Sequence, residues 1–195
     1  MKLHIIAVAY ERPIALRVLI DCFLLQTCPD WELNIVYDGP IPKDIMEVLK
    51  LYKGERRIFY TNTQKRIGNF GHPNRASMLQ AIKGKKDDYV LITNDDNYYV
   101  PKFVEFFLYS TNPTIGMVYC NTLHSYYAYD VHQSMIQEKC IDMGCFIVRL
   151  DVAQETGFNH YNHSADGLYA EECQATCKRK GLTSRYIPKA LFIHN

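Results

Sequence analysis

Short strand-like segments alternate with helix-forming segments through the first half of the chain, and this alternation constrains the fold more than any other feature. The expected strands are residues 3–9, 33–37, 57–60 and 89–93, and the expected helices are residues 13–26, 44–52, 73–83 and a segment from 101. The first strand, LHIIAVA, is continuously apolar apart from His4, which is typical of a strand covered on both faces. The alternation therefore predicts an α/β fold with a mostly parallel central sheet and helices on both faces.

The second half of the chain is less regular. The expected elements are strands at 116–120 and 141–149, a Tyr-rich stretch at 124–130, a helix from 151, a His-rich loop at 159–166, a helix that ends at 180, and short strands that end at Ile193. The sequence contains no linker, internal repeat or low-complexity segment. We therefore expect residues 1–195 to form one domain, which its length also favours.

Composition excludes some classes of protein. The 22 Lys and Arg residues balance 21 Asp and Glu residues, so the chain does not bind nucleic acid through bulk charge. The 15 tyrosines suit sugar or base recognition as well as core packing. No apolar stretch approaches the ~20 residues of a membrane span, and none resembles a secretory signal. The lack of such segments and the seven scattered cysteines together predict a cytoplasmic protein. Cys173 and Cys177, four residues apart, are either a metal pair or buried thiols.

Polar residues follow three of the expected strands, at 10–12, at Asp38 and at 94–97. In a parallel sheet, ligands bind outside the carboxyl ends of the strands, so these residues should meet in one crevice. The chain has no G-x-G-x-x-G after its first strand and no G-x-x-x-x-G-K-[ST]. These absences argue against a dinucleotide oxidoreductase and a P-loop enzyme.

The adjacent carboxylates of Asp95 and Asp96 are the first candidate metal site. Two like charges side by side are costly unless a cation or a polar ligand lies between them. A divalent ion that bridges the carboxylates and a diphosphate would fulfil this need, and a solvated turn is the alternative. His194 follows the last expected strand and could be a further ligand, which would favour Mn²⁺ over Mg²⁺.

Several motifs resemble those of family-2-like glycosyltransferases of the GT-A fold, and they occur in the family's order along nearly the whole chain. The matching stretches are IIAVAYERP, QTCPDWE followed by IVYDG, GHPNR, Asn94-Asp95-Asp96 at the position of the DxD motif, residues 141–157, and residues 185–194. Two features depart from the family's pattern. Asn94 replaces the first Asp of the DxD motif, and three carboxylates, Asp166, Glu171 and Glu172, compete for the late acidic position.

The resemblance implies a role for each matching residue. Those implied to bind the nucleotide-sugar donor are Ala9, Tyr10, Arg12, Asp38, Arg75, Asp95 and Asp142. Tyr10 and Asp38 would hold the base, and Arg75 would support the nucleotide and its diphosphate. Asp95 would contact the ribose or another part of the donor, and Asp142 the hydroxyls of the donor sugar. Asp96 and His194 would bind Mn²⁺ or Mg²⁺. Residues 1–100 would form the nucleotide-sugar half of the domain and residues 101–195 the acceptor and catalytic half.

The implied reaction is transfer of a sugar from a UDP-hexose or UDP-uronic acid to a hydroxyl acceptor, with inversion. Inversion requires a carboxylate to remove the acceptor's proton. Asp166 is the candidate because it follows the polar loop and precedes a helix, although it could instead cap that helix; Glu171 is the second candidate. A nucleotidyltransferase and a non-catalytic carbohydrate-binding domain are the alternatives. The small chain leaves little room for an acceptor domain, so a partner or homodimer could complete that side.

Overall fold

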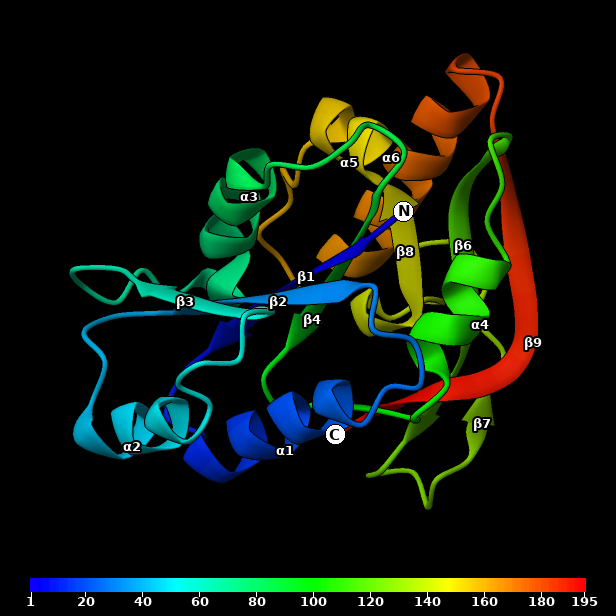
Figure 1. Cartoon of the computed structure of the whole chain (residues 1–195). Coiled ribbons are helices and arrows are strands. Elements are labelled where there is room, and N and C mark those ends of the chain that lie inside the picture. Colours follow the sequence, from blue (N-terminus) through cyan, green and yellow to red (C-terminus); the bar gives the residue numbers. More distant parts are fainter.

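The computed structural model describes residues 1–195 and is built on one nine-stranded sheet (Figure 1). The strands are β1 (Leu3–Ala9), β2 (Trp31–Tyr37), β3 (Ile58–Asn62), β4 (Tyr89–Asn94), β5 (Tyr98–Tyr99), β6 (Ile115–His124), β7 (Val131–His132), β8 (Phe146–Arg149) and β9 (Thr183–His194). Their order is β3-β2-β1-β4-β8-β6-β9-β5, with β7 paired to β6. The long pairings β1/β2, β1/β4, β2/β3 and β6/β9 are parallel, and the short ones are antiparallel. The expected mostly parallel sheet is confirmed.

Helices cover both faces of this sheet, as expected. They are α1 (Pro13–Leu24), α2 (Lys43–Leu51), α3 (His72–Ala81), α4 (Phe103–Tyr109), α5 (Leu150–Thr156) and α6 (Ala165–Arg179), with 3-10 turns at Asn69–Gly71 and Met143–Cys145. In Figure 1, α1 and α2 lie on one face, and α3, α5 and α6 lie on the other. None of these helices is both long enough and apolar enough to cross a membrane.

The central strand β1 determines where a ligand can bind. All seven of its residues are buried, because β2 and β4 flank it and helices cover both faces. The chain leaves β1 toward β2 on one side and later returns as β4 on the other side. Such a change of direction opens a crevice at the carboxyl ends of the two neighbouring strands. Here these ends are Ala9 and Asn94.

Two expected segments differ from the structure. The strand predicted at 141–149 begins only at Phe146, because the Asp142 carboxylate accepts a hydrogen bond from Gly144 N at 2.9 Å and caps a 3-10 turn. The short strands predicted near the C-terminus are one strand, β9, which bends strongly in Figure 1. Pro188 stands in a bulge between residues 187 and 190, where its missing N–H costs no ladder hydrogen bond.

The cysteines form no disulfide. Cys173 and Cys177 are buried thiols on α6, and burial raises the pKa of Cys177 to about 11. Of the two alternatives for this pair, buried thiols are therefore correct.

A buried histidine links β1 to the strands on either side of it. His4 Nδ1 lies 2.8 Å from Glu32 Oε1, and Nε2 lies 3.3 Å from Asp88 Oδ2. The ring of His4 therefore lies between two carboxylates, which can both accept hydrogen bonds. Burial alone would raise the pKa of Glu32 and of Asp88, but hydrogen bonds from His4 and from neighbouring groups outweigh it and lower both.

We expect His4→Ala to lower the free energy of unfolding by about 2–4 kcal/mol at neutral pH, because it leaves a cavity in a buried site and removes one partner from each of two carboxylates. A carboxyl group whose pKa is lower in the folded state stabilises the fold at a pH above its unfolded-state pKa. This stabilisation is lost as the pH falls and the carboxylate is protonated. The difference between wild type and variant should therefore shrink below about pH 4. Urea denaturation at neutral pH and at a pH below about 4 measures this difference in the free energy of unfolding. Lys2→Ala removes only a half-exposed partner of Glu32 and is the control, with a loss below about 1 kcal/mol; equal losses would contradict the prediction.

Candidate active site

The loop after β1 and the turn after β4 meet at the crevice, as the sequence predicts. Tyr10 N donates a hydrogen bond to Asp95 Oδ2 at 3.0 Å, and Arg12 Nη2 lies 2.6 Å from Asp95 Oδ1. Arg12 also forms an ion pair with Asp96. Burial raises the pKa of Asp95 to about 6, although the charge of Arg12 opposes this shift. Arg12 thus covers the acidic pair, and its side chain is 46% exposed and can turn into solvent.

A cavity of about 270 Å³ adjoins this loop and brings together five of the predicted donor-binding residues. It is lined by Val8, Ala9, Tyr10, Arg12, Asp38, Arg66, Gly68, Phe70, Gly71, Arg75 and Asn94. The guanidinium of Arg66 lies 4.0 Å from the centre of the Tyr10 ring, on the face that a stacked base would need. Gly71 is required here, because a Cβ atom would lie 2.6 Å from Val8 Cγ1 and its φ is +74°.

Asp38 holds one side of this cavity together. Its carboxylate accepts hydrogen bonds from Ile67 N and Gly68 N, both at 2.9 Å, and from Asn74 Nδ2 at 3.0 Å. Burial would raise the pKa of Asp38, but these hydrogen bonds lower it. Asp38 therefore fixes the loop that carries Arg66, and its contact with a base stays a prediction.

Arg75 is the buried cation at the centre of the crevice. From α3 its guanidinium contacts Asn94 Oδ1, Phe70 O and His72 Nδ1. Burial lowers the pKa of Arg75 to about 10, while the charges of Asp166, Asp95, Asp142 and Asp96 raise it. The side chain therefore stays charged at neutral pH, close to carboxylates from both halves of the chain.

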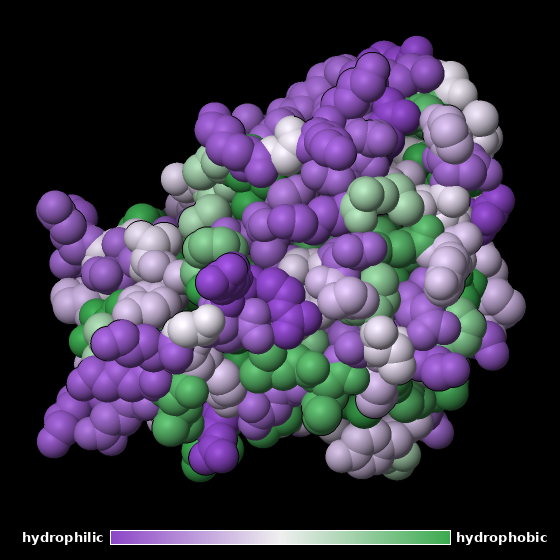
Figure 2. Space-filling view, viewed as in Figure 1, coloured by the Kyte–Doolittle hydropathy of each residue, from purple (hydrophilic) through white to green (hydrophobic).

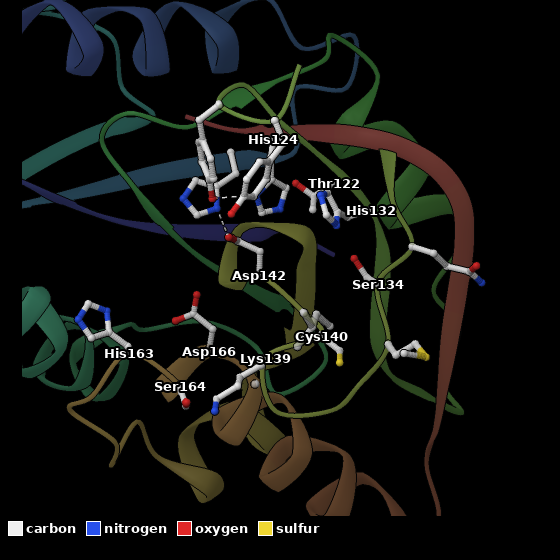
Figure 3. A pocket seen from close by; sticks show the side chains of 17 residues that line it. Thr122, His124, His132, Ser134, Lys139, Cys140, Asp142, His163, Ser164 and Asp166 are labelled. Carbon is white, nitrogen blue, oxygen red and sulfur yellow. Dashed lines mark hydrogen bonds and ion pairs between the residues drawn. The ribbon is translucent and has the colours of Figure 1, made fainter. Parts of the chain in front are cut away.

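A second, larger cavity has a volume of about 530 Å³ (Figure 3). Asp142, Asp166 and His194 line it. Met143 N donates a hydrogen bond to Asp166 Oδ2 at 3.2 Å. Burial and the nearby charge of Asp142 raise the pKa of Asp166 to about 7, although the charge of Arg75 opposes them. A carboxyl with this pKa can remove a proton from a substrate near neutral pH.

Glu171 does not reach this cavity. Its exposed carboxylate accepts a hydrogen bond from Glu138 N at 2.7 Å, and Glu172 pairs with His160 instead. Of the three competing carboxylates, the structure thus brings only Asp166 to the crevice. Because Asp166 bonds to Met143 and makes no side-chain cap at the start of α6, the capping alternative is wrong.

Asp96 and His194 have the chemistry of metal ligands. Asp96 Oδ1 and His194 Nδ1 are buried atoms without a well-formed hydrogen bond in the protein. Burial would lower the pKa of His194, but the ion-pair contact of its ring with Asp142 raises it. No group of three or more His, Cys, Asp or Glu side chains is arranged to hold a metal ion. Each residue thus has an oxygen or nitrogen that could serve as a ligand, and their joint binding of a cation stays a prediction.

Sequence reasoning missed four aromatic or cationic residues that line the cavities. Arg66 and Phe70 line the smaller one, and His124 and Lys139 line the larger one. The basic pair Lys65-Arg66 before a glycine-containing loop was a usable signal for Arg66. His124 begins the Tyr-rich stretch at 124–130, but its position in the cavity depends on where β6 ends.

Comparison with solved structures identifies this arrangement as the GT-A glycosyltransferase fold. The S. aureus TarS 1–349 structure superimposes with a TM-score of 0.81 at 14% identity, covering 100% of this chain and 60% of that one. The structure of TarS 1–349 in complex with UDP-GlcNAc superimposes with a TM-score of 0.79 at 15% identity, covering 100% of this chain and 58% of that one. The mannosyltransferase PcManGT from Pyrobaculum calidifontis, in complex with GDP-Man and Mn²⁺, superimposes with a TM-score of 0.72 at 12% identity. The match covers 99% of this chain and 56% of that one.

The chain therefore spans about 60% of the length of these structures. No protein-family model matches the sequence, and no curated protein is significantly similar to it.

Proposed function

We propose that this protein is a metal-dependent glycosyltransferase that moves a hexose or uronic acid from a UDP-sugar to a hydroxyl acceptor, with inversion. The observation that carries the proposal is the pairing of two cavities at the switch point of a GT-A sheet. One contains Tyr10 and Arg75 for a nucleotide, and the other contains the proton-accepting carboxyl of Asp166. The structural neighbours bind UDP-GlcNAc, or GDP-Man with Mn²⁺, which supports a nucleotide-sugar donor.

The donor would occupy the smaller cavity. The base stacks on Tyr10, and Arg66 either moves away or covers the opposite face of the base. Arg75 stabilises the negative charge that develops on the departing diphosphate. Arg12 turns away from Asp95 and Asp96 and leaves their oxygens free for ribose and cation.

Asp96 and His194 would hold the cation. When bound, Mn²⁺ or Mg²⁺ supplies Lewis-acid stabilisation of the leaving diphosphate. Asp142 orients hydroxyls of the donor sugar, and Asp166 removes the proton of the attacking acceptor hydroxyl. Asp166 lies in the half formed by residues 101–195, which we assign to the acceptor. A second copy of the chain could complete that side.

A panel of nucleotide sugars tests the proposal. UDP-glucose, UDP-GlcNAc, UDP-glucuronic acid and GDP-mannose are incubated with Mn²⁺ or with EDTA, and the released products are identified. We expect UDP and free sugar from a UDP-sugar with Mn²⁺, and neither with EDTA. Release of pyrophosphate instead would indicate a nucleotidyltransferase. Donor binding without turnover, with any acceptor, would indicate a non-catalytic binding domain.

Tyr10 gives a separate prediction about the nucleotide. If its ring stacks on the base, Tyr10→Ala should weaken UDP binding about tenfold in calorimetry, as expected for one lost stacking contact. Wild type should bind UDP more tightly than GDP or ADP. Tyr60→Ala is the matched control, because Tyr60 is a half-exposed tyrosine on β3 that lines neither cavity. Tighter binding of GDP, or an equal effect of both substitutions, would contradict the prediction.

A further inference from the structure

One wall of the larger cavity consists of aromatic rings that border His194, the proposed cation ligand. His124 lies beside His132 (Figure 3), with 4.4 Å between their ring centroids. The His124 centroid also lies 5.2 Å from that of Tyr126 and 5.9 Å from that of Tyr127. Tyr126 and Tyr127 are 55% and 58% exposed. They therefore contribute little to the core, although most large apolar side chains of this chain are buried there.

The turn that presents these tyrosines is fixed by hydrogen bonds. Tyr127 N and Tyr129 N both donate to His124 O at 3.1 Å, and the Tyr126 hydroxyl bonds to His124 Nδ1 at 2.7 Å. Ala128 and Tyr129 adopt φ values of +52° and +60°, which cost side-chain-bearing residues on the order of 1 kcal/mol each. The exposed tyrosines do not offset this cost by burial, which is typical of a turn retained for ligand contact.

The opposite wall of the cavity is polar. It presents Lys139, Ser164 and Asp166, and Lys139 forms no ion pair (Figure 3). Only 5 of the 17 lining residues are hydrophobic, so the cavity has no apolar groove for a lipid tail. A pyranose has an apolar C–H face that stacks on aromatic rings and hydroxyls at its edge that bond to polar groups. The cavity matches both requirements.

We propose that this cavity binds the acceptor and that the acceptor is a saccharide, with a pyranose ring on Tyr126 and Tyr127 and its reacting hydroxyl directed to Asp166. The proposal rests on the glycosyltransferase function. In the transfer step, the acceptor oxygen bonds to the anomeric carbon as the bond from that carbon to the diphosphate oxygen breaks. The diphosphate leaves with the electron pair, and the acceptor's proton passes to Asp166.

The test offers three acceptor classes with whichever donor the panel shows to be hydrolysed. They are neutral methyl pyranosides, a polyprenyl phosphate in detergent micelles, and a serine-containing peptide. We expect transfer to the pyranosides only. Tyr126→Ala and Tyr127→Ala should raise the KM for the pyranoside about tenfold and change the KM for the donor by less than about twofold. Tyr126→Phe keeps the ring and should keep the acceptor KM.

Tyr109→Ala is the matched control, because Tyr109 is 84% exposed on α4 and does not line the cavity. Transfer only to the polyprenyl phosphate or the peptide would overturn the proposal, as would equal KM values for Tyr126→Ala and Tyr109→Ala. Saturation-transfer NMR with a methyl pyranoside reads binding directly, without turnover. If no donor is hydrolysed, the glycosyltransferase function fails. Loss of the NMR signal in Tyr126→Ala would then still support the saccharide site, and no signal with wild type would overturn it.

Discussion

Replacing Asp166 by asparagine is expected to lower the rate of sugar transfer by ~10²–10⁴, the usual cost of losing a positioned base. Asparagine keeps the shape of the side chain and can still accept the hydrogen bond from Met143 N, but it cannot take a proton. UDP affinity should stay nearly unchanged, because Asp166 does not line the smaller cavity that contains Tyr10 and Arg75. Steady-state kinetics and calorimetry on the same preparations measure both quantities.

The raised pKa of Asp166 predicts two pH effects. Transfer by the wild type should rise with pH through about 7, as the carboxyl loses its proton. In addition, a folded-state pKa of about 7 lies above the unfolded value of about 3.9, so ionisation of Asp166 destabilises the fold as pH rises between these values. Asp166→Asn removes this loss, and its melting temperature above neutral pH should be equal to or higher than that of the wild type.

Glu171→Gln is the control for this prediction, because Glu171 is a carboxylate on the same helix that does not line the cavity. It should retain the wild-type transfer rate. An inactive Glu171→Gln together with an active Asp166→Asn would assign the base to Glu171. A variant Asp166→Asn that is unstable yet fully active per folded molecule would show that Asp166 is structural.

Asp96→Ala is expected to reduce Mn²⁺-dependent turnover by about a thousandfold, since cation stabilisation of a leaving diphosphate contributes several kcal/mol. It should also weaken Mn²⁺ binding, measured by titration in the presence of UDP. The substitution leaves Arg12 its ion pair with Asp95, so the fold should persist. Thermal melting checks this.

Asp87→Ala is the control, because Asp87 is an exposed carboxylate just before β4. It should change neither Mn²⁺-dependent turnover nor Mn²⁺ affinity. Full turnover of the wild type in EDTA would contradict the metal role. Unchanged Mn²⁺ affinity in Asp96→Ala would assign the cation to other residues.

The strands near the crevice could be predicted from the sequence because their signal is local. The apolar run of β1 and the proline that starts α1 specify their own conformation, and strand–helix alternation then places the carboxyl ends at one edge. Tyr10, Arg12, Asp38 and Arg75 were found in this way together with the family resemblance, and they line one cavity.

Only the tertiary structure decided which late carboxylate enters the crevice. Asp166 and Glu171 are five residues apart on α6, which separates them by about 140° around the helix axis. Both are acidic residues in the sequence, but the packing of α6 against the sheet directs only the Asp166 side chain into the crevice. The bend of β9 has the same origin, because it depends on pairing with β6, and pairing between segments far apart in the chain leaves no periodic signal in the sequence. The aromatic wall around His124 lies within residues 124–132, but only the tertiary structure places it against His194, 5.1 Å from His124 between ring centroids.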